Sequence, residues 1–210
     1  MKPPRGLPRE GSFPRLKLMK NTTEGNWCQC HLANRKGWEL LQKIDSDLAE
    51  QAREKGCPRC EGKLHRADYE RKPRGGPKWD RRDSFCCERE GCRRRRTPPS
   101  VRFLGRRVYA GFVVVLISAM RHGLKPGRVE AIREQLGIDR RTLERWREWW
   151  LSGFVEGSFW QAARVRFMPI LCERTLPWPL GLRFGIESVR GLAKLLGFLA
   201  PLTGPSEPAM

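Results

Sequence analysis

The sequence predicts an α+β protein in which a small β unit is followed by a mainly α-helical region. Paired cysteines between residues 57 and 92 favour a β unit built around tight turns. Residues 105–151 show the pattern of a helix, a glycine turn and a basic helix, and residues 152–200 contain apolar positions at helical spacing. The 210 residues allow one or two small domains, and eight Trp and nine Phe argue against wholesale disorder.

The N-terminal part of the chain divides into an arm and a helix. Because its first residues are rich in Pro, Gly and basic side chains without periodicity, we expect residues 1–37 to form a disordered basic arm. In this arm Cys28, Cys30 and His31 are spaced like half of a metal site, but no second half lies nearby. Residues 38–56 are predicted to form an amphipathic helix, since apolar residues recur every three or four positions, at Trp38, Leu41, Ile44, Leu48 and Ala52.

The central stretch contains two pairs of cysteines. Cys57 and Cys60 form the first pair, and Cys92 forms the second with either Cys86 or Cys87. Two such pairs on tight turns can aim four sulfurs at one point, and Zn²⁺ binds four thiolates tetrahedrally. We prefer Cys87 because the shorter loop to Cys92 closes a turn more readily, and Cys86 then faces the other side of its strand. The sequence therefore predicts a zinc ribbon over residues 57–104, with a structural Zn²⁺ bound by Cys57, Cys60, Cys87 and Cys92.

Disulfides and ordinary thiols are the alternatives to a metal site. Disulfides require an oxidising compartment. The basic start of the chain is not followed by an apolar stretch, so we expect no signal peptide and a cytoplasmic location. A zinc ion with four protein ligands has no open position for water or substrate, so its role would be structural.

The positive charge of the chain points to a polyanionic partner. The formal net charge is +19, and more than half of this surplus lies between residues 53 and 107. Nucleic acid is the partner that such a charge favours. The run Arg93, Arg94, Arg95 and Arg96, expected on a strand after Cys92, suits phosphate binding, with a merely solvated charge run as the alternative. The longest apolar run, residues 108–120, is shorter than the roughly 20 residues of a membrane span, so no membrane contact is expected.

Residues 105–151 fit a helix-turn-helix. A first helix is expected over residues 106–121 and a second over 128–136. Gly137 can adopt the positive φ that ends a helix, and Asp139 can cap the next one. The third helix would lie in the major groove of DNA, whereas a plain helical hairpin is the alternative. We expect its first turns to expose the DNA-binding residues, Arg140, Arg141, Thr142 and Arg145.

Past Trp150 the sequence predicts further helices. Residues 152–200 contain several prolines and then an apolar stripe at helical spacing, and residues 201–210 are expected to form a tail. In the simplest interpretation these helices complete the core of the helix-turn-helix unit. A surface for homo-oligomer formation is the alternative.

The order of these motifs resembles the N-terminal region of zinc-ribbon insertion-sequence transposases. The resemblance covers about residues 57–150, and it implies that a zinc ribbon and a helix-turn-helix bind duplex DNA. Members of that family continue with a ribonuclease H-like domain whose acidic residues hold two Mg²⁺ ions. Here no Asp follows Asp139, and the carboxylates beyond Trp150 are scattered at Glu156, Glu173, Glu187 and Glu207. We therefore expect no catalysis of strand transfer.

The function expected from the sequence is zinc-stabilised DNA binding without enzymatic activity. The protein would be bacterial, associated with the nucleoid, and either derived from a transposase or accessory to a transposon, with a transposase or other protein as a further partner. The alternatives are a transcriptional regulator of the same architecture, a partner subunit of a nuclease or recombinase, and an RNA-binding zinc-ribbon protein.

Overall fold

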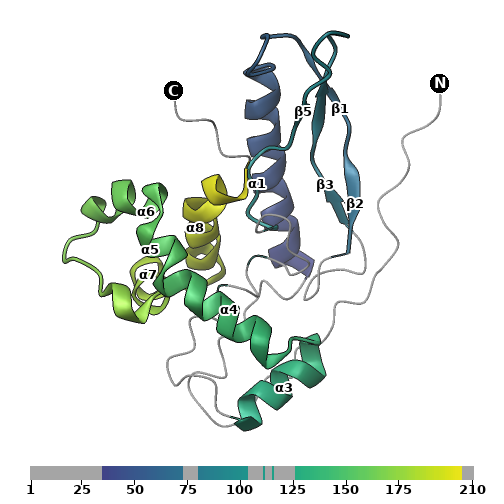
Figure 1. Cartoon of the computed structure of the whole chain (residues 1–210). Coiled ribbons are helices and arrows are strands. Elements are labelled where there is room, and N and C mark those ends of the chain that lie inside the picture. The colour runs from purple at the N-terminus through teal and green to yellow at the C-terminus, as the bar shows by residue number, and fades with distance from the viewer. Residues whose placement is uncertain (1–34, 73–79, 104–110, 112–114, 116–125, 205–210) are drawn as a thin grey trace.

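The computed structural model of the chain describes residues 35–72, 80–103, 111, 115 and 126–204. Its helices and small antiparallel sheets confirm the α+β class (Figure 1). The predicted arm up to residue 34, the helix expected over residues 106–121, apart from Gly111 and Val115, and residues 205–210 lie outside the described residues. Across the part of the chain that is described, no helix combines the length and apolarity needed to cross a bilayer.

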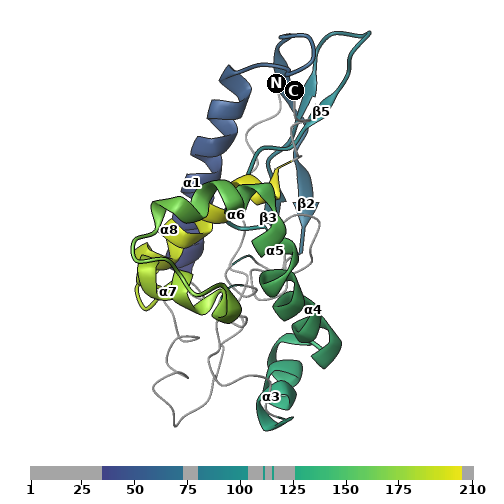
Figure 2. The ribbon, with the colours of Figure 1, turned by 60° about the vertical axis from the view of Figure 1, so that its left-hand side comes forward.

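Helix α1 spans Arg35–Glu54, so the expected amphipathic helix is present with shifted ends. It begins three residues before the predicted start at residue 38, inside the predicted arm of residues 1–37, and it ends two residues before residue 56. Trp38, Leu41, Ala49 and Ala52 lie on its buried face, as the spacing of the apolar residues predicts. The helix runs alongside the strands in both views of the molecule (Figures 1 and 2). Helix α1 therefore lies along one side of the β unit.

In the described part of the chain, five short strands form two antiparallel sheets. Strands β1 (Leu64–Arg66), β4 (Phe85–Cys87) and β5 (Arg95–Arg96) form a three-stranded sheet in the order β1-β4-β5. Strands β2 (Tyr69–Arg71) and β3 (Asp80–Arg82) form a separate pair. The first sheet packs on α1 through a small core that contains Ala49, Ala52, Leu64 and Phe85.

The predicted helix–turn–helix sequence around Gly137 forms two helices. Helices α3 (Pro126–Leu136) and α4 (Arg140–Leu151) are joined by a three-residue turn. Gly137 has φ of 62°, which favours glycine, and Ile138 is fully buried. The Asp139 carboxylate accepts a hydrogen bond from the Thr142 N–H at 2.6 Å and caps α4.

Short helices complete the fold after α4. They are α5 (Gly153–Glu156), α6 (Ser158–Ala163), η3 (Arg164–Arg166), η4 (Glu173–Thr175), α7 (Trp178–Phe184), α8 (Val189–Leu199) and η5 (Ala200–Thr203). Their apolar residues share one core with α4 and α1, to which Trp150, Trp160 and Leu195 contribute. A Cβ on Gly191 would lie 1.9 Å from the Gly185 carbonyl oxygen, so α8 approaches the end of α7 only with glycine at this position.

The prediction that residues 201–203 belong to a tail is wrong. Residues 200–203 belong to η5, and Thr203 is buried. Its hydroxyl accepts a hydrogen bond from the Ser100 N–H at 2.7 Å, which ties the C-terminal helices to the segment after β5. This contact joins residues that are 103 positions apart, so no local sequence pattern predicts it.

Candidate metal centre and nucleic-acid surfaces

The structure brings the four predicted cysteines together. The sulfurs of Cys57, Cys60, Cys87 and Cys92 all lie within 4.8 Å of one another, and four such groups could hold a metal ion. The Cys57 and Cys92 sulfurs are 3.7 Å apart, and the Cys60 and Cys87 sulfurs are 3.4 Å apart. Thiolates around Zn²⁺ with bonds of about 2.3 Å lie about 3.8 Å from each other, so small shifts of these side chains suffice to bind the ion.

Two turns with the same hydrogen-bond pattern aim the sulfurs. In each turn the N–H of the first cysteine donates, over 3.0 Å, to the carbonyl two residues after the second cysteine, from Cys57 to Gly62 and from Cys87 to Arg94. The residue that follows the second cysteine has a positive φ in both turns, 57° at Glu61 and 42° at Arg93. A positive φ is sterically unfavourable for residues other than glycine, and it persists only where the surrounding structure, here the hydrogen-bonded turn, holds the backbone in place. The two turns are thus built alike although their cysteines are spaced differently.

Cys86 and His65 lie outside the cysteine cluster. The Cys86 sulfur is 3.5 Å from the Arg93 carbonyl oxygen, on the other side of β4 from Cys87. The exposed His65 ring places Nε2 3.3 Å from a carboxylate oxygen of Glu88. The geometry therefore leaves Cys87 as the third ligand candidate.

The thiols of the cluster differ in acidity. The backbone N–H of Arg59 stabilises the Cys57 thiolate and lowers the pKa of Cys57 to about 6. Burial raises the pKa of the Cys87 thiol to about 12. Because metal ligands must be deprotonated, a cation at this centre would displace the remaining thiol protons. Four thiolates and no open position suit a structural Zn²⁺.

The prediction that Arg93 to Arg96 share one strand is wrong. Strand β5 contains only Arg95 and Arg96, because the positive φ of Arg93 closes the second cysteine turn. The Arg95 guanidinium donates to the Ala67 carbonyl at 3.0 Å, and that of Arg96 donates to the Gly56 carbonyl at 2.7 Å. These two arginines thus brace the β unit, whereas Arg93 and Arg94 project from its surface.

At the start of α4 the predicted DNA-binding residues are only partly exposed. Arg140, Arg141 and Arg145 are exposed, and Arg140 forms an ion pair with Glu144 at 2.8 Å. The expected exposure of Thr142 is wrong, since this residue is buried. Its hydroxyl accepts a hydrogen bond from the Arg145 guanidinium at 3.0 Å, so Thr142 helps to orient Arg145.

The two basic surfaces lie at opposite ends of the molecule. The cysteine turns are at the end where α1 finishes and β5 begins, and the α3–α4 pair projects at the other end (Figures 1 and 2). A duplex that contacted both surfaces would have to run along the molecule.

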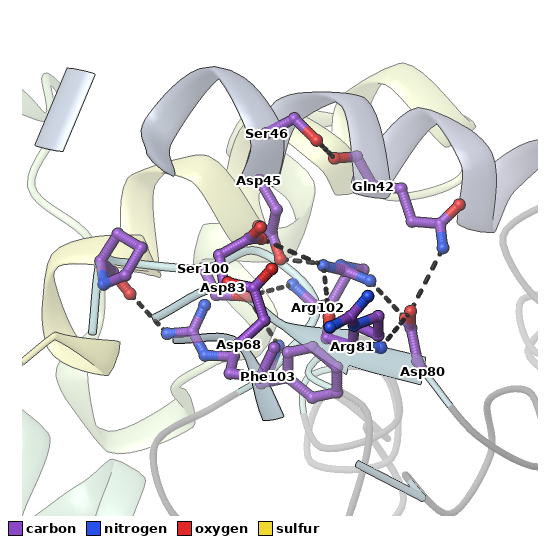
Figure 3. Close-up of polar contacts among 12 residues, drawn as sticks. Gln42, Asp45, Ser46, Asp68, Asp80, Arg81, Asp83, Ser100, Arg102 and Phe103 are labelled. Carbon is purple, nitrogen blue, oxygen red and sulfur yellow. Dashed lines mark hydrogen bonds and ion pairs between the residues drawn. The ribbon is translucent and has the colours of Figure 1, made fainter. Parts of the chain in front are cut away.

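A buried ion-pair network joins α1 to the β unit. Arg102 donates from Nε to Asp45 at 2.8 Å and from Nη1 to Asp80 (Figure 3). Asp45 also accepts the Val101 N–H at 2.6 Å, and Asp80 accepts the Trp38 indole N–H at 2.8 Å. Charged groups as buried as these are held in place by ion pairs and hydrogen bonds.

Sequence reasoning missed this network, although it contained one sign of it. Asp45 lies four residues after Leu41 and four before Ala49, which places a carboxylate on the buried face of α1. An acidic residue in the phase of an apolar stripe indicates a buried cation opposite. Nothing in the sequence around Arg102 identifies it as that cation.

Comparisons of the chain with models of protein families, with curated proteins and with solved structures gave no match. The resemblance to zinc-ribbon transposases therefore rests on the order and spacing of the motifs.

Proposed function

We propose that this chain is a zinc-stabilised DNA-binding protein without catalytic activity, derived from a transposase or accessory to a transposon. The observation that carries the proposal is the presence, in one chain of net charge +19, of a four-cysteine centre and a capped helix with exposed arginines. Neither feature alone implies DNA binding. Their order along the chain, with the basic segment between them, favours it.

Zinc would act as the cross-link of the β unit. Cys57 and Cys60 would hold it from one turn, and Cys87 and Cys92 from the other. The ion supplies a fixed tetrahedral centre and no reactive position, because every ligand comes from the protein. The two turns would then carry their neighbouring arginines on a rigid support.

The arginines near the cysteine turns suit phosphate contacts. Arg93 and Arg94 are exposed beside the second turn, and the carbonyl contacts of Arg95 and Arg96 hold the strand that follows. Guanidinium groups bind phosphate oxygens through paired N–H donors. Contacts of this kind position a protein on DNA without reading its sequence.

Helix α4 is the candidate for contact with base edges. Leu143, Trp146 and Trp150 bury one face of the helix, so its position is fixed by the core. The opposite face presents Arg140, Arg141 and Arg145 near its N-terminus. In helix-turn-helix proteins the N-terminal residues of the second helix contact bases in the major groove.

We predict different losses for Arg94→Ala and Arg141→Ala. Loss of a phosphate contact at Arg94 should weaken binding equally on all duplexes and lower the slope of log K against log salt by roughly 0.9. Loss of a base contact at Arg141 should cost about 1–3 kcal/mol on a preferred site and relax specificity there. The measurement is affinity against salt concentration on a site selected from random duplexes and on random duplex itself.

Arg183→Ala is the matched control, because Arg183 is an exposed arginine on α7 and its loss changes the net charge equally. Since the two surfaces lie at opposite ends, the losses in Arg94→Ala and Arg141→Ala should add in the double variant. Equal weakening of both DNAs by Arg141→Ala would show that α4 does not contact bases. If Arg183→Ala lowered the affinity for duplex DNA as much as Arg94→Ala, the effect would come from net charge and not from a phosphate contact at Arg94.

We also predict that the purified chain neither cleaves nor joins DNA with Mg²⁺ or Mn²⁺. Among the residues that the structure describes, the group that could hold a metal consists of cysteines alone. The buried carboxylates of Asp45 and Asp80 are occupied by Arg102. The measurement is conversion of supercoiled plasmid to nicked or linear forms. Asp83 is a half-buried carboxylate 3.5 Å from the Arg102 guanidinium. Metal-dependent nicking that a point substitution such as Asp83→Asn abolished would contradict the prediction.

A further inference from the structure

A groove of about 610 Å³ lies beside the cysteine centre. The C-terminal half of α1, the first cysteine turn, the segment around β5 and the residues near η5 line it. Its volume falls within the range of roughly 300–1,000 Å³ that is typical of ligand-binding sites. Neither the proposed zinc centre nor α4 accounts for this groove.

Among the residues that the structure describes, the lining of the groove is basic and contains no carboxylate. Three exposed cationic residues form what we term the basic rim, and the N–H donors of Arg96 lie beside them. The Arg96 guanidinium is held by the Gly56 carbonyl oxygen, so part of this charge is ordered before any ligand arrives. An anionic occupant fits such a lining. The basic rim consists of Lys55, Arg59 and Arg94.

The inner part of the groove is apolar. Leu48, Ala52 and Pro99, which are buried or half-buried, form what we term the apolar floor. Duplex DNA presents sugars and phosphates on its outside, so it would contact the basic rim and leave the apolar floor uncovered. Single-stranded nucleic acid usually binds by stacking bases on aromatic rings, and no aromatic side chain of the described part of the chain lines this groove. A short peptide segment that carries both acidic and apolar side chains would contact the basic rim and cover the apolar floor.

We propose that this groove is the docking site for a peptide segment of a protein partner that carries acidic and apolar side chains. The acidic side chains pair with the basic rim, and the apolar ones cover Leu48, Ala52 and Pro99. The inference goes beyond DNA binding, because the groove would keep its lining in a protein that bound no DNA. Arg94 belongs both to the basic rim and to the proposed phosphate surface, so the peptide and DNA compete for this residue.

The test uses the zinc-loaded full chain and short fluorescein-labelled peptides. A peptide of alternating Glu and Leu is compared, by fluorescence anisotropy, with one of equal charge in which Ser replaces Leu. We expect the Glu/Leu peptide to bind at least about tenfold more tightly, since its apolar side chains leave water. The variant Gln51→Glu, at an exposed lining position, places a carboxylate in the groove and should weaken this binding several-fold.

Lys43→Gln is the matched control, because it lowers the net charge equally from an exposed position of α1 outside the groove lining. It should change peptide affinity by less than about twofold, as expected for a remote surface charge. Equal binding of the Glu/Leu and Glu/Ser peptides would overturn the proposal, since the apolar floor would then play no part. If Gln51→Glu weakened binding of oligothymidine and left the Glu/Leu peptide unaffected, the occupant would be nucleic acid.

Arg141→Ala separates this proposal from DNA binding. Duplex affinity and peptide affinity are both measured in this variant, and only the duplex affinity should fall, because Arg141 does not line the groove. Failure of the wild-type chain to bind any duplex, together with tight binding of the Glu/Leu peptide, would overturn the proposed function and leave the docking site in place. Normal duplex binding without peptide binding would overturn the docking site and leave the proposed function in place.

Discussion

Substitution of Cys57 by serine is expected to remove zinc from the protein and to unfold the β1–β4–β5 sheet. The core of this sheet is small, since Ala49, Ala52, Leu64 and Phe85 are its main apolar residues besides the cysteines. So little buried apolar surface does not stabilise a short-stranded sheet without a cross-link. In structural zinc sites the free energy of metal binding is also free energy of folding.

The measurement combines elemental analysis with amide hydrogen exchange. We expect one zinc ion per wild-type chain and none in Cys57→Ser or Cys87→Ser. In these variants the N–H groups of β4 should lose their protection, whereas α8 should keep its own, because Leu192, Leu195 and Leu196 belong to the larger helical core.

Cys86→Ser is the matched control, since Cys86 is adjacent to Cys87 and its sulfur lies near the Arg93 carbonyl oxygen. This variant should retain zinc and the protection of β4. If Cys86→Ser lost zinc and Cys87→Ser kept it, the third ligand would be Cys86 and the assignment to Cys87 would be wrong. If elemental analysis found no zinc in the wild-type protein, the zinc-ribbon interpretation would be wrong.

The parts of the site that could be predicted from the sequence are those set by neighbouring residues. The Cys57–Cys60 and Cys87–Cys92 spacings determine turns whose hydrogen bonds close within a few residues. In the same way, the positive φ of Gly137 and the cap formed by Asp139 depend only on residues one to four positions away. Local rules therefore sufficed to locate the cysteine turns and the boundary between α3 and α4.

The parts that could not be predicted depend on packing between distant segments. A charge run gives no indication that the Arg96 guanidinium binds the Gly56 carbonyl 40 positions earlier. The groove beside the cysteines likewise requires α1, β5 and Pro201 to meet, and no single stretch of sequence contains all three. Tertiary contacts thus decide which arginines brace the protein and which remain on its surface.

Replacement of Arg102 by methionine is expected to destabilise the protein by about 3–5 kcal/mol, as is typical when one partner of a buried ion pair is lost. Methionine keeps much of the side-chain volume but leaves the carboxylates of Asp45 and Asp80, both buried, without their shared cation. The Arg81 carbonyl would also lose the donor that now lies at 3.1 Å. The measurement is urea unfolding of zinc-saturated protein followed by tryptophan fluorescence, because the Trp38 indole bonds to Asp80.

Arg66→Met is the matched control for this loss. The Arg66 side chain is 56% exposed and lies 3.7 Å from Asp68 and from Asp83, so its removal should cost only about 0–1 kcal/mol. Addition of Asp80→Asn to Arg102→Met should restore part of the stability, because it removes one unpaired charge and keeps an oxygen that can accept the Trp38 N–H. Equal costs for Arg102→Met and Arg66→Met, or a double variant no more stable than Arg102→Met, would contradict the role given to this network. The positive result would mean that the joint between α1 and the β unit depends on charge pairing as well as on zinc.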